Sequence, residues 1–294
     1  MEITASAVKE LRERSGAGMM ECKKALVQNN GDMEASIDWL RTQGLAKADK
    51  KSSRITAEGR IAYAGDATIA IMVELNCETD FVAKDENFVN FAEQVAKAAL
   101  AAKTADLEVI KGLMIDGVTV ETHRQALVAK IGENIQIRRA EMVHGQTVGT
   151  YLHGTRIGVV VNLNGGDAEF ARGIAMHVAA MTPSYLSMEQ VPAEAYEREK
   201  QIAIDQAKDS GKPADIIEKM VVGKIRKTLG DQTLLGQVYS GPTGDGSATV
   251  DALLKQAKAS VVKFVRFAVG EGIEKKQEDF AAEVMAQVQA SKKE

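Results

Sequence analysis

The side chains of this chain that could do chemistry are its histidines, its two cysteines and two clusters of glycines. The histidines are His123, His144, His153 and His177. They show neither the H-x-x-x-H nor the H-E-x-x-H spacing of zinc sites, and the chain has no C-x-x-C pair and no G-x-S-x-G nucleophile turn. Gly16–Gly18 follows no strand, and Gly241–Gly246 lacks the Lys-Ser/Thr of a phosphate-binding loop. We therefore expect no catalytic residue, no metal site and no cofactor.

A better candidate for a functional site is the stretch Asn76–Lys84, which reads Asn-Cys-Glu-Thr-Asp-Phe-Val-Ala-Lys. The β-branched run Ile69–Leu75 before it predicts a buried strand. Asp85 after it can cap a helix whose apolar positions recur at helical spacing. Phe81 is therefore expected on a strand-to-helix loop between two charged residues. Loops carry binding groups more often than packed elements do, so this ring is a candidate contact for a partner.

Three features have more than one interpretation from the residues alone. Phe81 either meets a partner or folds back against the core, and the sequence gives the two equal weight. Met19 and Met20 are adjacent on a predicted helix and cannot both face one small core, so one of them should be exposed. That pair fits core filling and partner contact equally well. His177 lies among apolar residues of a predicted helix and is expected to be a core or edge histidine.

Composition and charge narrow the class of protein. The chain has 294 residues, of which 45% are hydrophobic and only 4% aromatic, which favours helices over an all-β sandwich. Its net charge is −4 with no basic stripe, so direct nucleic-acid binding is disfavoured. The start of the chain lacks the pattern of a signal peptide, and no apolar run is long enough to span a membrane. Two distant cysteines fit a reduced state, and we expect a cytoplasmic protein.

The first 54 residues predict a compact domain of three helices. Thr4 can cap the first helix, Gly16–Gly18 ends it, and Asp32 can cap the third. The second and third helices are expected over Met19–Val27 and Met33–Leu40. The polar run Lys47–Arg54 is expected to be a linker.

The middle of the chain predicts an α+β core with a weak internal repeat. The expected strands are Gly59–Asp66, Ile69–Leu75, Ile135–Arg139, Thr147–His153 and Arg156–Leu163, with helices near 85–102, 120–132 and 167–180. Ile71–Asn76 resembles Val159–Asn164, and each is followed by a helix that contains a Phe-Ala pair. The connection in the first copy is nine residues longer, and the extra residues fall across Thr79–Val82. Packing alone does not require a loop of that length.

Beyond the core, residues 188–229 predict a projecting antiparallel hairpin of two helices. Its expected apolar stripe consists of Ile202, Ile216, Ile217, Met220, Val221 and Ile225. The hairpin could dimerise, contact a partner or simply project into solvent. A helix over Thr249–Ala259, a strand over Val261–Val269 and a final helix from Asp279 complete the predicted elements.

Long motifs of the chain closely resemble those of the bacterial elongation factor Ts family. The two principal motifs are Leu11–Leu26 and Asn76–Lys84, and three shorter ones are Leu127–Asn134, Ile174–Ala180 and Arg266–Ile273. The matches occur in order along essentially the whole chain. The resemblance implies guanine nucleotide exchange on elongation factor Tu, without enzymatic catalysis by the chain itself.

The resemblance also implies an organisation into domains. It implies a three-helix domain of ubiquitin-associated type over residues 1–54, and two related α+β subdomains over 55–140 and 141–265. The helical hairpin 188–229 would be an insertion in the second subdomain, and 266–294 would form a C-terminal helical module.

By the same resemblance, Thr79, Asp80, Phe81 and Val82 enter the partner beside its Mg²⁺ site, where the Phe ring disturbs the ion and the phosphate-binding loop. Further contacts with elongation factor Tu are implied for Arg12, Met19, Met20, Ile131, Gly132 and His153. Two other classes of function stay open from the residues: an adaptor that binds without changing nucleotide affinity, and a small-molecule enzyme, for which the sequence offers no candidate pocket. A homodimer through the hairpin is a further expectation.

Overall fold

Three helices form the N-terminal domain: α1 Ala5–Ser15, α2 Met19–Gln28 and α3 Met33–Lys51. The computed structural model describes residues 3–208, 213–242, 244 and 246–274, without the side chains of 45–49 and 208. Thr4 caps α1 by accepting the N–H of Ala7, and Gly16 ends it in the left-handed conformation, with φ of 68°. The buried core of this domain is Val8, Leu11, Cys22, Ala25 and Leu26. The predicted three-helix domain is confirmed.

The expected linker at Lys47–Arg54 is wrong, because α3 continues as a helix through Lys51. The segment contains no glycine or proline after Gly44 and is rich in alanine and lysine, which are strong helix formers. The helix also lies along α7 (Val120–Ile131): a Cβ placed on Gly44 would stand 3.5 Å from that of Ala129. The N-terminal domain is therefore joined to the core by a continuous helix, α3, that packs on α7.

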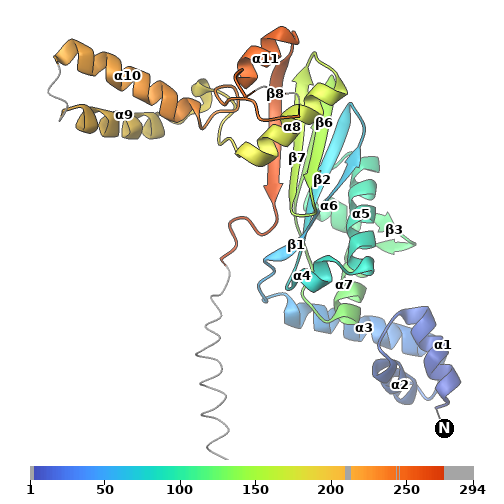
Figure 1. Ribbon diagram of the computed structural model, residues 1–294. Coiled ribbons are helices and arrows are strands. Elements are labelled where there is room, and N and C mark those ends of the chain that lie inside the picture. Colours follow the sequence, from blue (N-terminus) through green and yellow to red (C-terminus); the bar gives the residue numbers. More distant parts are fainter. Residues whose placement is uncertain (1–2, 209–212, 243, 245, 275–294) are drawn as a thin grey trace, which may run out of the picture.

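The first half of the core is a three-stranded antiparallel sheet covered by helices on one face (Figure 1). The strand order is β1-β2-β5, so the central strand is β2. The elements are β1 Glu58–Gly65, β2 Ile69–Cys77, α4 Asp80–Ala83, α5 Glu86–Ala101, α6 Leu107–Gly112, β3 Met114–Ile115, β4 Val118–Thr119, α7 and β5 Gln136–His144. Asp85 caps α5 as expected, by accepting the N–H groups of Asn87 and Phe88.

The second half has the same plan, with strand order β6-β7-β8 and α8 on its outer face (Figure 1). Its elements are β6 Thr147–His153, β7 Ile157–Asn164, α8 Ala168–Met181, η1 Met188–Gln190, α9 Ala193–Lys208, α10 Ala214–Gly230, α11 Val250–Gln256 and β8 Ser260–Ala268. Each half thus consists of a strand hairpin, a covering helix and a third strand that returns to the central one.

The internal repeat extends to a β-bulge at equivalent positions of the two sheets. In the first sheet Glu74 pairs with Arg139 but Leu75 pairs with Ile137, so Arg138 is the extra residue. In the second sheet the same slip occurs after Asn162, which occupies the position of Glu74 in the repeat. The two related α+β halves expected from the sequence are confirmed.

The two sheets pack face to face, with helices on the outside. Alternate residues of β2 point to opposite faces: Ile71 and Val73 belong to the cluster under α5, whereas Met72 belongs to a cluster shared by both sheets. That shared cluster consists of Ile61, Ala70, Met72, Val143, Val148, Val160, Phe267 and Val269. At Gly158 of β7, an added Cβ would lie 2.7 Å from Ile61, so the close approach of the sheets requires glycine there.

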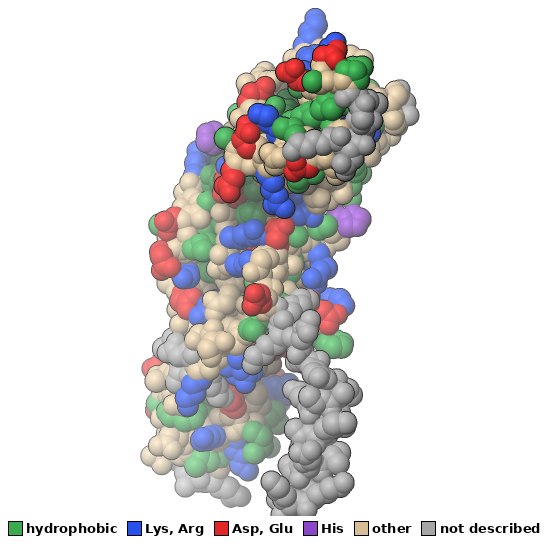
Figure 2. Space-filling model, turned by 90° about the vertical axis from the view of Figure 1, so that its left-hand side faces the viewer, with side chains coloured by type: hydrophobic (Ala, Val, Ile, Leu, Met, Phe, Trp, Pro, Cys, Tyr) green, Lys and Arg blue, Asp and Glu red, His purple; other side chains and the backbone are tan. Residues whose placement is uncertain are grey.

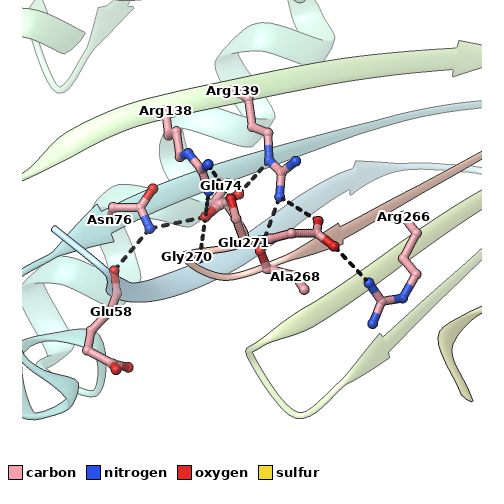
Figure 3. Close-up of polar contacts among 9 residues, drawn as sticks. All are labelled: Glu58, Glu74, Asn76, Arg138, Arg139, Arg266, Ala268, Gly270 and Glu271. Carbon is pink, nitrogen blue, oxygen red and sulfur yellow. Dashed lines mark hydrogen bonds and ion pairs between the residues drawn. The ribbon is translucent and has the colours of Figure 1, made fainter. Parts of the chain in front are cut away.

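A buried carboxylate lies at one end of the interface between the two sheets. Glu74 is 0% exposed, and its Oε1 accepts from Arg138 Nη1 at 3.0 Å and from the backbone N–H of Gly270 at 2.8 Å (Figure 3). Asn76 Nδ2 donates to the same oxygen at 3.1 Å, and Arg139 Nε donates to Oε2 at 2.5 Å. Burial opposes ionisation, but these hydrogen bonds outweigh it, so the pKa of Glu74 is lowered below its ordinary value of 4.5.

The same arginines hold the turn that follows β8 (Figure 3). Arg139 Nη2 donates to the carbonyl of Ala268 at 3.1 Å, and Arg138 donates to the carbonyl of Glu271. The carboxylate of Glu271 lies 3.4 Å from Arg139 and 3.5 Å from Arg266. The chain therefore leaves β8 along a path that β2 and β5 fix.

The helical hairpin α9–α10 projects from the end of the core opposite the N-terminal domain (Figure 1). Its predicted apolar stripe is partly wrong: Val221 and Ile225 are buried, but Ile202, Ile216 and Met220 are about 40% exposed. The seam is formed instead by Ala203 and Ala207 of α9 against Val221, Ile225 and Leu229 of α10. Two helices share only one seam, and the small alanines at i, i+4 let α10 approach α9 closely.

Two expected subdomain boundaries, 140/141 and 265/266, fall inside β5 and β8. Most of the expected C-terminal module, including the helix from Asp279, lies outside the described residues.

We predict that Glu74→Gln lowers the free energy of unfolding at pH 7 by about 2–4 kcal/mol, because it removes a charge from a buried, paired network. Since the folded pKa of Glu74 is lowered, its contribution is present above pH 4.5 and is lost as the pH falls below that value. Urea titrations at pH 7 and below pH 4.5 should show a smaller difference between wild type and variant at the acid pH.

Glu141→Gln is the matched control. Glu141 also lies on this sheet and pairs with Lys263, but its side chain is 36% exposed. Its loss should change stability by about 0–1 kcal/mol. Equal effects of the two substitutions at pH 7 would contradict the role given to Glu74.

Candidate functional site

The candidate site is the turn that joins β2 to α5. The expected loop contains one short helical turn, α4, capped by Thr79, whose Oγ1 accepts the N–H of Val82 at 3.4 Å. Phe81 is 81% exposed, so the interpretation in which its ring folds against the core is wrong. Val82 and Ala83 are buried in the main core cluster and anchor the turn from below. The ring therefore projects from a turn that is fixed to the core.

The four predicted residues of this turn differ in what they present to solvent. Thr79, Asp80 and Phe81 are exposed, whereas Val82 is only 8% exposed and points into the core. Asp80 pairs with Lys84 at 2.7 Å, and this hydrogen bond holds the pKa of Asp80 below its usual range. Val82 is therefore an anchor of the turn in this structure, and the surface consists of Thr79, Asp80 and Phe81.

Glu133 braces the turn from the α7–β5 connection. Its Oε2 accepts the backbone N–H groups of Glu78 at 3.0 Å and Thr79 at 2.9 Å. Its Oε1 accepts the hydroxyl of Thr79 at 2.6 Å. One ionised side chain thus binds three donors directly before Asp80 and Phe81, and such charge-assisted hydrogen bonds are stronger than neutral ones.

The same connection is tied to the end of α3. Glu78 Oε1 accepts the N–H of Asn134 at 2.7 Å and lies 3.4 Å from Arg54 Nη1. Asn134 Nδ2 donates to the carbonyls of Ser52 at 3.2 Å and Arg54 at 2.8 Å. Lys51 at the end of α3 donates to the carbonyl of Gly132. The N-terminal domain, the α7–β5 connection and the Phe81 turn therefore meet at one place.

The other predicted contacts lie on separate elements. Arg12 is exposed on α1, and both Met19 (49%) and Met20 (77%) are exposed on α2, where only one was expected. Ile131 and Gly132 are half-buried at the end of α7, directly before Glu133. His153 is exposed at the end of β6, where its Nδ1 is 3.1 Å from the hydroxyl of Tyr151. Of these residues, only Ile131 and Gly132 are brought beside the turn, because Glu133, which follows them in the chain, accepts hydrogen bonds from Glu78 and Thr79.

Sequence reasoning did not single out Glu133 and Asn134. Both were noted only as part of Leu127–Asn134, a motif used for the resemblance, because nothing in their spacing shows that they meet residues 54 or more positions away. The signal that could have found them is the pairing of two motifs that meet neighbouring strands, since Asn76–Lys84 begins at the end of β2 and Leu127–Asn134 ends just before β5.

The remaining titratable candidates are structural. His177 is buried, with its Nδ1 accepting the N–H of Ser240 at 3.1 Å and its Nε2 3.0 Å from Gln237 Oε1. Burial lowers its pKa, and the predicted core histidine is confirmed. Among the described residues, no group of three His, Cys, Asp or Glu side chains could hold a metal ion.

Cys77 supports the turn from the end of β2. Its thiol donates to the carbonyl of Thr79 at 3.2 Å. Burial, and then the nearby carboxylates of Glu133 and Glu58, raise the pKa of Cys77 to about 12. Cys22 is also buried and free, so neither cysteine forms a disulfide.

A pocket of about 640 Å³ lies between the N-terminal helices and α7. The residues that line it include Trp39, Leu40, His123, Lys24 and Lys130.

On the face shown in Figure 2, basic and acidic side chains are mixed, without a large field of one sign. No helix of the described part of the chain is long and apolar enough to cross a membrane.

The fold and the site together define a class of protein that presents a fixed, exposed aromatic side chain on a two-sheet α+β core. Comparison with known proteins identifies the family. The family described as Elongation factor TS matches residues 78–271. Elongation factor Ts of Thioalkalivibrio sulfidiphilus (strain HL-EbGR7) is 56% identical over 296 residues, which cover 99% of this chain and 100% of that protein.

Two further relatives agree. Elongation factor Ts of Xanthomonas oryzae pv. oryzae (strain PXO99A) is 56% identical and covers 98% of this chain and 99% of its own length. That of Idiomarina loihiensis (strain ATCC BAA-735 / DSM 15497 / L2-TR) is 54% identical over 100% of both chains. The chain belongs to the elongation factor Ts family and is a translation elongation factor.

We predict that Cys77 reacts with iodoacetamide at pH 8 about 10³-fold more slowly than an exposed cysteine of ordinary pKa, because its pKa rises from 9.0 to about 12 and only the thiolate reacts. Mass spectrometry of the intact chain over time measures this. In guanidinium chloride both cysteines should react at once, which serves as the control. Rapid alkylation of Cys77 in the folded chain, located by peptide mapping, would contradict the prediction.

Proposed function

We propose that this chain binds elongation factor Tu in its GDP-bound form and promotes the release of GDP and its exchange for GTP. The Thr79–Val82 turn would enter the partner beside its Mg²⁺ site, with the ring of Phe81 displacing side chains there. The observation that carries the proposal is the 81% exposure of Phe81 on a turn held by Glu133, Thr79 and the buried Val82. A large apolar ring fixed in water favours binding because no further ordering of the chain is needed.

The energetics support this assignment. A GTPase holds its nucleotide largely through phosphate oxygens and Mg²⁺, so a disturbed metal site weakens binding at its strongest point. Burial of one Phe side chain contributes about 1.5–3 kcal/mol. This corresponds to about 10–150-fold in a rate. A larger acceleration would have to come from the rest of the interface, which holds the open state of the partner.

The remaining predicted contact residues are assigned to binding the partner. Arg12, Met19 and Met20 would contact the nucleotide domain of elongation factor Tu. Ile131, Gly132 and His153 would contact its third domain. Exposed methionines adapt to a partner surface, which suits Met19 and Met20. The action is proposed in the cytoplasm, through protein contacts and without direct contact to nucleic acid or membrane.

An adaptor that binds elongation factor Tu without changing its affinity for nucleotide is the competing function. It predicts an unchanged rate of GDP dissociation in the presence of saturating chain. The measurement of GDP release described next therefore distinguishes the two functions and also tests the role of Phe81.

We predict that Phe81→Ala lowers the chain-stimulated release of GDP from elongation factor Tu by about 10–150-fold, because it removes the ring that the partner would bury. Stopped-flow release of a fluorescent GDP measures the rate. The urea midpoint should be unchanged, since the ring lies in solvent. Met114→Ala, which truncates a residue 62% exposed on β3, should leave release unchanged. Release at the wild-type rate with Phe81→Ala would disprove the proposed mechanism.

A homodimer through the hairpin is the second proposal, supported by the exposure of Ile202, Ile216 and Met220 on its outer surface. Ile216 and Met220 are neighbours at i, i+4 on α10, and adjoining exposed apolar side chains can mark an interaction site. Light scattering should then give twice the 31.6 kDa of one chain, and Ile216→Glu with Met220→Glu should return it to one chain. A mass of one chain for the wild type at micromolar concentration would rule this out.

A further inference from the structure

We propose that Glu133 is a positioning residue for nucleotide exchange, which fixes the Phe81 turn relative to the rest of the binding surface. The inference depends on the proposed function of Phe81 and extends it to a residue that never meets the nucleotide. Its three hydrogen bonds to Glu78 and Thr79 are all made directly before the exposed ring.

The first argument is the number of constraints on the turn. On the β2 side, the backbone N–H groups of Glu78 and Thr79 would point at solvent without Glu133. Thr79 would also lose the acceptor of its own hydroxyl, while that hydroxyl caps α4. A four-residue helix is too short to be stable alone, so its geometry depends on these bonds and on the anchor Val82.

The second argument is what else the α7–β5 connection holds. Ile131 and Gly132, which the proposal assigns to one domain of the partner, are the two residues before Glu133. Asn134, the next residue, binds the carbonyls of Ser52 and Arg54, which follow α3 of the N-terminal domain. Four consecutive residues thus connect three parts of the proposed binding surface. A partner that touches all three meets them at a fixed spacing.

The consequence is a specific kinetic signature. Glu133→Gln keeps the size of the side chain but removes its charge and places an amide where two N–H donors need acceptors. The turn loses its position while the other contacts remain. The rate of GDP release at saturating chain should fall about tenfold, and the chain concentration for half-maximal effect should change by less than about threefold. A residue that only stabilises the fold would instead lower the urea midpoint and leave the saturating rate of the folded chain unchanged.

The experiment measures release of fluorescent GDP from elongation factor Tu with the full chain in a double-mutant cycle. Glu133→Gln should have no further effect when Phe81 is already alanine, because it acts through that ring. Thr79→Ala should act in the same direction as Glu133→Gln and be non-additive with it. Glu108→Gln, an exposed carboxylate on α6 that pairs with Lys111, is the matched control and should change nothing.

The outcomes separate this inference from the proposed function. If Phe81→Ala slows release but Glu133→Gln does not, or acts equally without the ring, the positioning role is overturned and the function of Phe81 stands. If Phe81→Ala has no effect, the proposed mechanism through Phe81 fails. Amide hydrogen exchange at residues 80–83 of the free chain then tests by itself whether Glu133 fixes the turn. Faster exchange in Glu133→Gln at an unchanged urea midpoint supports this role, and unchanged exchange overturns it.

Discussion

The carboxylate of Glu74 is the interaction on which the two halves of the core depend. A buried charge costs several kcal/mol to dehydrate unless its oxygens are fully used. Here the donors come from β2, from β5 and from the turn after β8, so three segments distant in sequence must meet at one point. The β-bulge at Arg138 is part of this solution. Successive side chains of a strand normally alternate, and the extra residue lets both Arg138 and Arg139 reach the same carboxylate.

The second half has a neutral counterpart of this contact. Asn162 occupies the equivalent position on β7, and its Nδ2 donates to the carbonyl of His144 at the end of β5 at 3.1 Å. Gly145 follows, where a Cβ would lie 1.9 Å from Asn162 Oδ1. Each central strand therefore binds the end of the other half's third strand. In one direction the group bound is the N–H of Gly270, which suits the carboxylate of Glu74 that Arg138 and Arg139 of its own half also bind; in the other it is a carbonyl, which suits an amide.

Much of this fold could be predicted from local pattern, because its helices and strands carry strong local signals. Thr4, Asp32 and Asp85 cap the helices they were expected to cap, and the Ile69–Leu75 run is a buried strand. The errors arose where tertiary contact decides. α3 extends into the polar run, as far as Lys51, because it packs on α7, and the hairpin seam uses two alanines that hydropathy does not single out. The exposure of Phe81 and the brace at Glu133 depend on contacts over more than 50 residues, which no local pattern contains.

The extra nine residues of the first repeat have an evolutionary consequence. In the second half the shorter connection from β7 to α8 shows that a core of this design closes without such a turn. The exposed ring adds nothing to the packed interior, so a chain that lost it would still fold, accumulate and escape proteolytic removal. Folding quality control would not detect such a change. Only selection on what the exposed ring does outside the packed interior could retain a phenylalanine at this position.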